Sequence, residues 1–157
     1  MWRGWWPRFA KRDSSFPGSA RPVLFTRRRP GVLIVDDQPG VRAVLQVGLE
    51  RQGFCSYVAA DGYQAVHLYR HHREVIDVVL LDVCMPGLDG PQTLAALREV
   101  NPQVRCCFMS GDLGRHTERA LRDLGAAAVL LKPFCLDEVA AALRQLACAA
   151  EWGPTAS

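Results

Sequence analysis

The sequence of 157 residues lacks the marks of several protein classes. No apolar run approaches the roughly 18 residues that span a bilayer, so we expect no transmembrane helix. Charges interrupt the N-terminal segment every few residues, which excludes the apolar core of a signal peptide. Lysine is scarce, with only Lys11 and Lys132 among nineteen basic residues. These absences predict a cytoplasmic globular protein and single out Lys132.

Cysteine is present without any of its usual patterns. The six cysteines form no CxxC pair and no Cys/His cluster with the spacing of a zinc site. Most of them lie inside apolar runs, where cysteine behaves as a small hydrophobic residue. We therefore expect buried free thiols in a reducing compartment rather than disulfides.

Basic charge is concentrated at the N-terminus. Residues 1–30 carry eight Lys/Arg and one acid, whereas residues 31–157 carry eleven Lys/Arg and fifteen acids. We expect residues 1–30 to form a disordered extension. The alternatives are weak contacts with an anionic membrane or nucleic acid, or an incorrectly assigned start of translation. The acidic remainder gives no support for nucleic-acid binding by the domain itself.

From residue 31, short apolar runs alternate with segments of helical periodicity. The strands are expected at 31–36, 54–60, 75–82, 104–110 and 127–132, and the helices at 40–53, 61–73, 90–100, 114–125 and 136–150. In the first helix, Val41, Val44, Leu45 and Leu49 have the spacing of an inward face. The strands are almost continuously apolar, which indicates that both faces of the sheet are covered. The pattern predicts an α/β fold, a doubly wound parallel sheet of five strands in flavodoxin-like order 2-1-3-4-5 with five helices.

Polar residues stand where four of these strands end: Asp36 and Asp37, then Asp82, Ser110 and Lys132. The carboxyl ends of parallel strands meet at one edge of the sheet, where such folds bind ligands. Each residue alone has a structural explanation, as a helix cap, a turn former or a solvated charge. Their coincidence on four strands favours a functional site.

The residue types indicate phosphoryl chemistry. Three neighbouring carboxylates repel one another, and a hard divalent cation such as Mg²⁺ removes that cost. Lys132 and Ser110 match the oxygens of a phosphoryl group. A carboxylate can also act as the nucleophile, and Asp82 on the central strand is the best candidate.

Four segments, VLIVDDQPGVR, LLDVCMPGLDG, FMSG and LLKPF, carry a family resemblance. Residues 31–149 resemble the receiver domain of two-component response regulators. The resemblance implies that Asp37, Asp82 and the backbone carbonyl of Cys84 hold Mg²⁺, with Asp36 helping directly or through water. It implies that Asp82 accepts phosphate from a sensor histidine kinase or phosphotransfer protein. It further implies that Lys132 pairs with that phosphate, that Ser110 is the switch hydroxyl, and that the peptide before Pro133 is cis.

Two departures accompany the resemblance. Val129 stands where the family often has an aromatic switch residue, and only a short tail, 150–157, follows the domain. We expect a stand-alone regulator without a DNA-binding domain, a phosphoacceptor rather than an enzyme. It would signal to an unknown protein through the face of the fourth helix, fifth strand and fifth helix.

Three other functions match parts of the sequence less well. A phosphorylation-independent pseudo-receiver is supported only by Val129. A dehalogenase-like phosphatase would need a second acid two residues after Asp82, where Cys84 stands. A nucleic-acid binder would act through residues 1–30.

Overall fold

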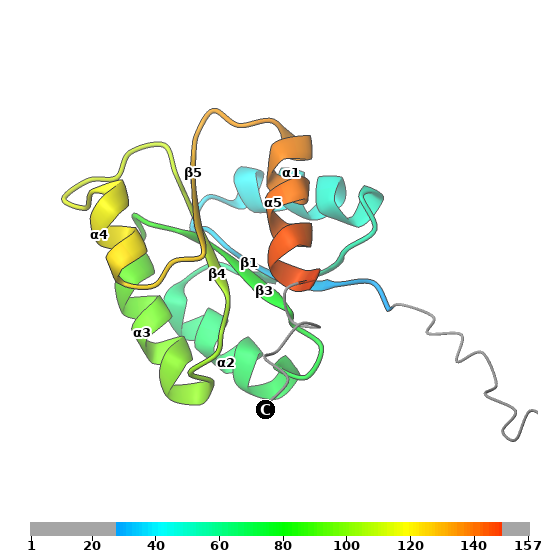
Figure 1. The fold of residues 1–157 in the computed structure, drawn as a ribbon, viewed down its shortest axis with the longest axis horizontal. Coiled ribbons are helices and arrows are strands. Elements are labelled where there is room, and N and C mark those ends of the chain that lie inside the picture. Colours follow the sequence, from blue (N-terminus) through cyan, green and yellow to red (C-terminus); the bar gives the residue numbers. More distant parts are fainter. Residues whose placement is uncertain (1–27, 149–157) are drawn as a thin grey trace, which may run out of the picture.

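The computed structural model describes residues 28–148, in which five strands alternate with five helices (Figure 1). The strands are β1 (Gly31–Val35), β2 (Cys55–Ala59), β3 (Val78–Asp82), β4 (Cys106–Ser110) and β5 (Ala128–Leu131). The helices are α1 (Pro39–Arg51), α2 (Gly62–His72), α3 (Gly90–Val100), α4 (Glu118–Asp123) and α5 (Leu136–Cys148). All strand pairs are parallel, in the order β2-β1-β3-β4-β5, which confirms the predicted fold. The expected C-terminal tail, and the expected extension up to residue 27, lie outside the described residues.

The sheet separates two apolar cores, because successive strand residues point to opposite faces. On one face, α1 and α5 cover Val32, Ile34 and Leu80. On the other face, α2, α3 and α4 cover Leu33 and Leu81. Figure 1 shows the same division, with α1 and α5 on one side of the sheet and α2 and α3 on the other.

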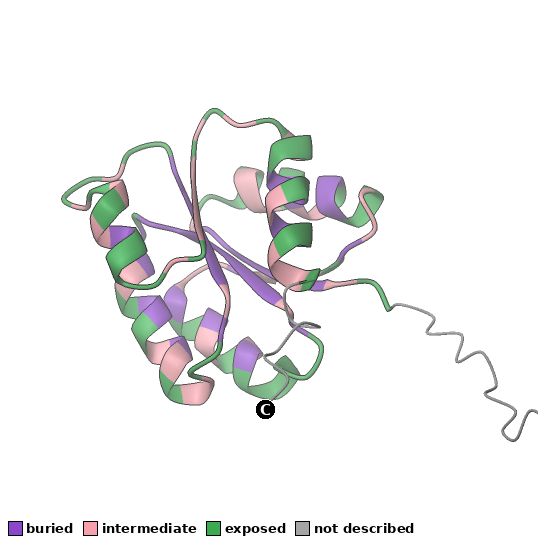
Figure 2. Ribbon diagram, in the orientation of Figure 1, coloured by how far each residue is buried: buried purple, intermediate pink, exposed green. Residues whose placement is uncertain are grey.

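Burial differs between the central and edge strands (Figure 2). Every residue of β1, β3 and β4 is buried. The edge strands β2 and β5 are partly exposed, with Cys55 and Leu131 at the surface. The expectation of full cover on both faces therefore holds for the three central strands, since each edge strand lacks one neighbour.

One predicted core position on α1 is wrong. Leu45 and Leu49 are buried, but the side chain of Val44 is 70% exposed. The inward face instead includes Gly48, where a Cβ atom would lie 2.4 Å from the Leu136 side chain. The absence of a side chain at Gly48 thus lets α5 pack closely against α1.

The fourth helix is shorter than predicted, because it begins at Glu118 rather than near residue 114. The Thr117 side chain accepts a hydrogen bond from Ala120 N and caps the helix. The preceding residues form turns instead, with Gly114 at φ 58° and its N–H donated to the Asp112 carboxylate. Local polar contacts therefore delay the start of the helix.

The expectation of free thiols is confirmed, because all six cysteines are free. The expectation that they are buried holds only for Cys106 and Cys107. Cys55, Cys84, Cys135 and Cys148 are exposed, since they lie at element ends and in loops. Among residues 28–148, no helix is long and apolar enough to cross a membrane.

An acid inside the third apolar run, Asp77, anchors the entry to β1. Its carboxylate accepts the N–H of Gly31 at 2.7 Å and both guanidinium nitrogens of Arg28, at 2.9 and 2.7 Å. Gly31 is buried, so its N–H has no access to water as an alternative partner. Arg28, which the sequence pattern assigned to the extension, is thus tied to the domain.

We predict that Asp77→Ala lowers the free energy of unfolding by about 1–3 kcal/mol, because the buried N–H of Gly31 loses its acceptor. Arg28→Ala should cost less than about 1 kcal/mol, because exposed ion pairs contribute little. Urea denaturation measures both. Equal losses would show that the ion pair, rather than the buried hydrogen bond, anchors the strand.

Candidate functional site

Three carboxylates gather at the carboxyl edge of the sheet. Val35 pairs with Leu81, so the next residues along these parallel strands, Asp36 and Asp82, lie side by side. Asp36 is fully buried, Asp82 is 6% exposed, and Asp37 is partly buried. This placement follows from strand register alone, which is why the sequence could predict it.

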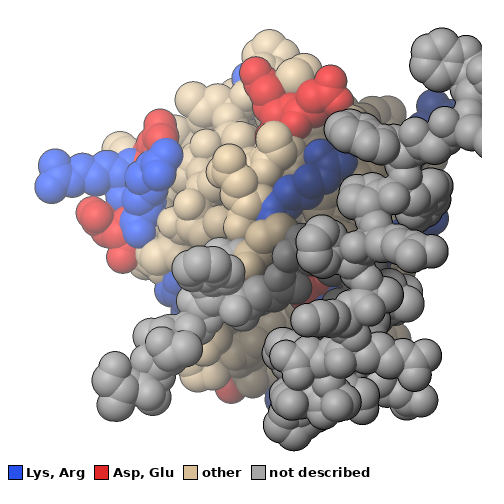
Figure 3. All heavy atoms as spheres, turned by 45° about the vertical axis from the view of Figure 1, so that its right-hand side comes forward, with Lys and Arg blue, Asp and Glu red and all other residues tan. Residues whose placement is uncertain are grey.

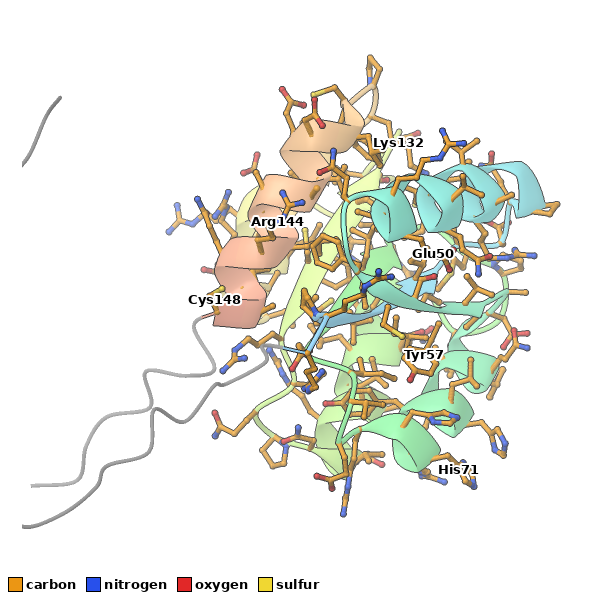
Figure 4. The ribbon with its side chains drawn as sticks, turned by 90° about the vertical axis from the view of Figure 1, so that its right-hand side faces the viewer. Glu50, Tyr57, His71, Lys132, Arg144 and Cys148 are labelled. Atoms are coloured by element: carbon orange, nitrogen blue, oxygen red, sulfur yellow. The ribbon has the colours of Figure 1, made fainter. Side chains whose placement is uncertain are left out.

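The Lys132 ammonium lies between two of these acids. Its Nζ donates to Asp36 Oδ2 and to Asp82 Oδ1, each at 3.1 Å. Lys132 directly follows β5, and its backbone N–H donates to the Ser110 carbonyl at 2.8 Å. The Lys132–Pro133 peptide is cis, the conformation that the family resemblance implies. In Figure 4, Lys132 lies at the end of the molecule where α5 begins.

The site retains an excess of negative charge. Burial raises the pKa of Asp82, and the Lys132 ammonium only partly offsets this while Asp36 and Asp37 add to it. Burial would lower the pKa of Lys132, but its hydrogen bonds and attraction to Asp36 and Asp82 outweigh that effect and raise it. One lysine that contacts two of the three carboxylates therefore stays protonated without neutralising the pocket.

Backbone groups fix the orientation of both buried acids. Asp36 Oδ1 accepts the N–H of Gln38 at 2.8 Å, and Asp82 Oδ2 accepts the N–H of Cys84 at 3.1 Å. Arg42 donates to the Asp36 carbonyl at 2.6 Å. Arg42 was not predicted as a site residue, because nothing distinguishes it from other surface arginines in the sequence.

Gly90 allows α3 to begin directly beside the site. A Cβ atom there would lie 2.6 Å from the Asp82 carbonyl oxygen and 2.9 Å from Val83 Cα. Both atoms belong to backbone that cannot rotate aside, so only glycine fits.

Two predicted site residues share a partner that the sequence did not reveal. The hydroxyl of Ser110 donates to the Asp112 carbonyl, and the thiol of Cys84 contacts the same oxygen at 3.3 Å. Ser110 is buried, whereas Cys84 is exposed. The loop after β4 is thus held by side chains from both β4 and the loop after β3. Val129 pairs with Phe108 and packs against the core that α2, α3 and α4 cover.

The donor set fits Mg²⁺. Within residues 28–148, no three His, Cys, Asp or Glu side chains are arranged to enclose a metal. Mg²⁺ usually takes one or two carboxylates and completes its octahedron with water and phosphate oxygens. Two strand-end carboxylates in a pocket with excess negative charge meet that need, and no nitrogen or sulfur ligand from His or Cys is expected to compete.

A family model for the response regulator receiver domain matches residues 32–144. The chain belongs to the response regulator receiver family. Receiver domains are signalling modules of two-component systems, which are phosphorylated by histidine kinases or phosphotransfer proteins and typically bind Mg²⁺.

Curated relatives agree with the family model. The chain is 34% identical over 116 residues to sporulation initiation phosphotransferase F of Bacillus subtilis, which covers 73% of this chain and 90% of that protein. It is 37% identical over 117 residues to the transcriptional regulatory protein PrrA of Mycobacterium tuberculosis, covering 74% of this chain. The match spans only about half of PrrA, 49% of its length.

Solved structures share the fold. The CheX–CheY–BeF3–Mg²⁺ complex of Borrelia burgdorferi matches with a TM-score of 0.68 and 30% identity, covering 74% of this chain and 87% of that chain. The receiver domain of the hybrid histidine kinase CckA matches with a TM-score of 0.63 and 29% identity, covering 74% of this chain and 98% of that one.

We predict that Asp82→Asn stabilises the metal-free protein at pH 7. The folded-state pKa of Asp82 is raised above its unfolded value, so ionisation at neutral pH costs stability. The difference in free energy of unfolding should shrink as the pH falls through the raised pKa and should vanish below the ordinary aspartate pKa of about 4. Urea denaturation in EDTA measures it.

The exposed Asp123 provides the matched control. Asp123→Asn should leave the free energy of unfolding unchanged both at pH 7 and below the ordinary aspartate pKa. A destabilised Asp82→Asn variant at pH 7 would show that the Lys132 contact outweighs burial of the carboxylate.

Proposed function

We propose that this chain is a phosphorylation-dependent receiver that accepts a phosphoryl group on Asp82 and signals by binding a partner protein. The observation that carries the proposal is the Lys132 ammonium, which lies 3.1 Å from both Asp36 and Asp82 at the edge of the sheet. A protein that used this pocket only as a binding module would have no need for an incompletely neutralised acid cluster.

Asp37 and Asp82, with the Cys84 backbone carbonyl, would hold Mg²⁺, and Asp36 would contribute directly or through water. Bound Mg²⁺ supplies positive charge that neutralises the acids and the incoming phosphoryl oxygens. The backbone hydrogen bond from Cys84 keeps one Asp82 oxygen in place, so the oxygen facing Lys132 is the natural nucleophile. Lys132 exchanges its contact with that oxygen for one with the phosphoryl group.

In the transfer step, an Asp82 carboxylate oxygen forms a bond to phosphorus while the bond from phosphorus to the donor histidine nitrogen breaks. The electron pair of that bond stays on the donor imidazole, and Asp82 becomes an acyl phosphate. The Ser110 hydroxyl then has a stronger acceptor in a phosphoryl oxygen than in the Asp112 carbonyl. The loop of residues 111–117 thereby loses its tether to Ser110, while Cys84 and the ion pair of Arg115 with Asp89 still hold it.

The output surface proposed here is the face formed by α4, β5 and α5. Two apolar side chains on it are exposed, Leu124 at 45% and Leu131 at 52%. Figure 3, which views the molecule from the side of α5, shows an uncharged region between groups of acidic and basic side chains. Such a surface suits a protein partner better than a nucleic acid.

We predict that acetyl phosphate with Mg²⁺ labels the full chain once, and that Asp82→Asn reduces the label to background. The exposed control, Asp123→Asn, should label like the wild type, because a surface carboxylate lacks Lys132 and the acidic pocket. Intact-mass spectrometry detects the added phosphate. A wild-type chain that stays unlabelled would support the pseudo-receiver alternative, and equal labelling of Asp82→Asn would place the phosphate elsewhere.

We predict that the Ser110→Ala variant accepts phosphate but that its loop of residues 111–117 no longer responds to phosphorylation. In this variant, the amide hydrogens of the loop should exchange faster in the resting state. Their exchange should not change on addition of Mg²⁺ and BeF3⁻, a phosphoryl mimic. Hydrogen exchange with mass spectrometry measures this, with Ser56→Ala on β2 as the matched control. A wild-type response in Ser110→Ala would remove the hydroxyl from the signalling route.

A further inference from the structure

Two histidines of α2 lie on one exposed face of the helix. His67 and His71 are four residues apart, a spacing that brings helical side chains together, with Cβ atoms roughly 5–6 Å apart. Their ring centroids are 4.5 Å apart with an interplanar angle of 47°. Both side chains are exposed, and Figure 4 labels His71 near the end of α2. Neither residue takes part in the acidic site.

A backbone hydrogen bond selects the tautomer of His71. Its Nδ1 lies 2.8 Å from the His67 carbonyl oxygen. A carbonyl can only accept, so Nδ1 carries the hydrogen and Nε2 of the neutral ring keeps a free lone pair. In metal-binding histidines, the N–H of the ring nitrogen that does not bind the metal usually donates a hydrogen bond in this way.

The helix that carries the pair is held firmly. Ala65 and Tyr69 bury its inner face, and the Asp61 side chain caps its first turn through Gln64 N. His71 lies in the last turn, where the helix dipole favours a cation. The two imidazoles are thus presented on a fixed backbone, which reduces the entropy lost when both bind one ion.

We propose that His67 and His71 form a surface binding site for one first-row transition-metal ion. Imidazole nitrogens suit Cu²⁺, Ni²⁺ and Zn²⁺, and affinity should follow the order Cu²⁺ above Ni²⁺. Within residues 28–148, no third His, Cys, Asp or Glu side chain joins the pair, so water completes the coordination. The site is therefore an open two-ligand chelate.

This site is separate from the acidic pocket. In a parallel α/β unit the helix runs back against the strands, so the end of α2 lies at the edge of the sheet opposite Asp82. Figure 4 shows His71 and Lys132 at opposite ends of the molecule. The two sites also differ in ligand chemistry, since Mg²⁺ prefers oxygen. The inference does not rest on the proposed phosphoryl transfer.

The test is isothermal titration of Ni²⁺ into the metal-free full chain, with the exposed thiols blocked by N-ethylmaleimide because thiolates also bind nickel. We expect one Ni²⁺ per chain, and about tenfold or greater loss of affinity in either His67→Gln or His71→Gln, since each removes one of two ligands. The matched control is His72→Gln. His72 is exposed on the same helix but stacks near Tyr57, with ring centroids 5.1 Å apart, and it should bind like the wild type.

The electron paramagnetic resonance spectrum of the Cu²⁺-loaded chain provides a second measurement and should show hyperfine coupling to two imidazole nitrogens. The proposal is overturned if the double variant His67→Gln/His71→Gln binds Ni²⁺ as tightly as the wild type. It is also overturned if His72→Gln loses as much affinity as the two single variants. Ni²⁺ binding that persists unchanged in Asp82→Asn would support a site that does not use the acidic pocket, and its loss would overturn the proposal.

Discussion

A single ammonium group shared by two buried carboxylates is the contact on which this structure depends. Lys132 comes from the strand at one edge of the sheet and reaches past β4 to Asp36 and Asp82 on the central strands. Burial raises the pKa of Asp82 despite its ion pair, and the neighbouring Asp36 and Asp37 add to that rise, so three acids and one lysine leave the pocket negative. The same excess of negative charge favours a divalent cation, and the charge of that cation would then attract a phosphoryl group.

The surrounding packing serves this arrangement. The strands β1 and β3 are buried on both faces, so the carboxylates at their ends are held by rigid backbone rather than by loops. Gly90 lets α3 begin against the Asp82 carbonyl, and Gly48 lets α5 approach α1. Close approach at both glycines keeps the site compact on the two sides of the sheet.

The sequence predicts the acids and the lysine because strand periodicity and parallel pairing are enough to bring their ends together. It does not predict the Asp112 carbonyl as the partner of both Ser110 and Cys84, since a backbone oxygen in a loop leaves no signal in residue type. The late start of α4 and the exposure of Val44 were missed for a related reason. Local turn contacts and the closeness of a neighbouring helix, rather than periodicity, decide both positions.

The two ends of α4 differ in a way that bears on how a receiver with Val129 could signal. Arg98 of α3 donates to the carbonyls of Leu124 and Gly125 and so secures the C-terminal end of α4. The preceding loop is held by Ser110 and Cys84 at the Asp112 carbonyl oxygen and by Arg115 at the Asp89 carboxylate. Withdrawal of Ser110 toward a phosphoryl group would therefore loosen the loop before α4, while the Arg115–Asp89 contact remains and the other end of the helix stays fixed. Under the proposed function, this movement reaches the face of α4, β5 and α5 without an aromatic switch at position 129.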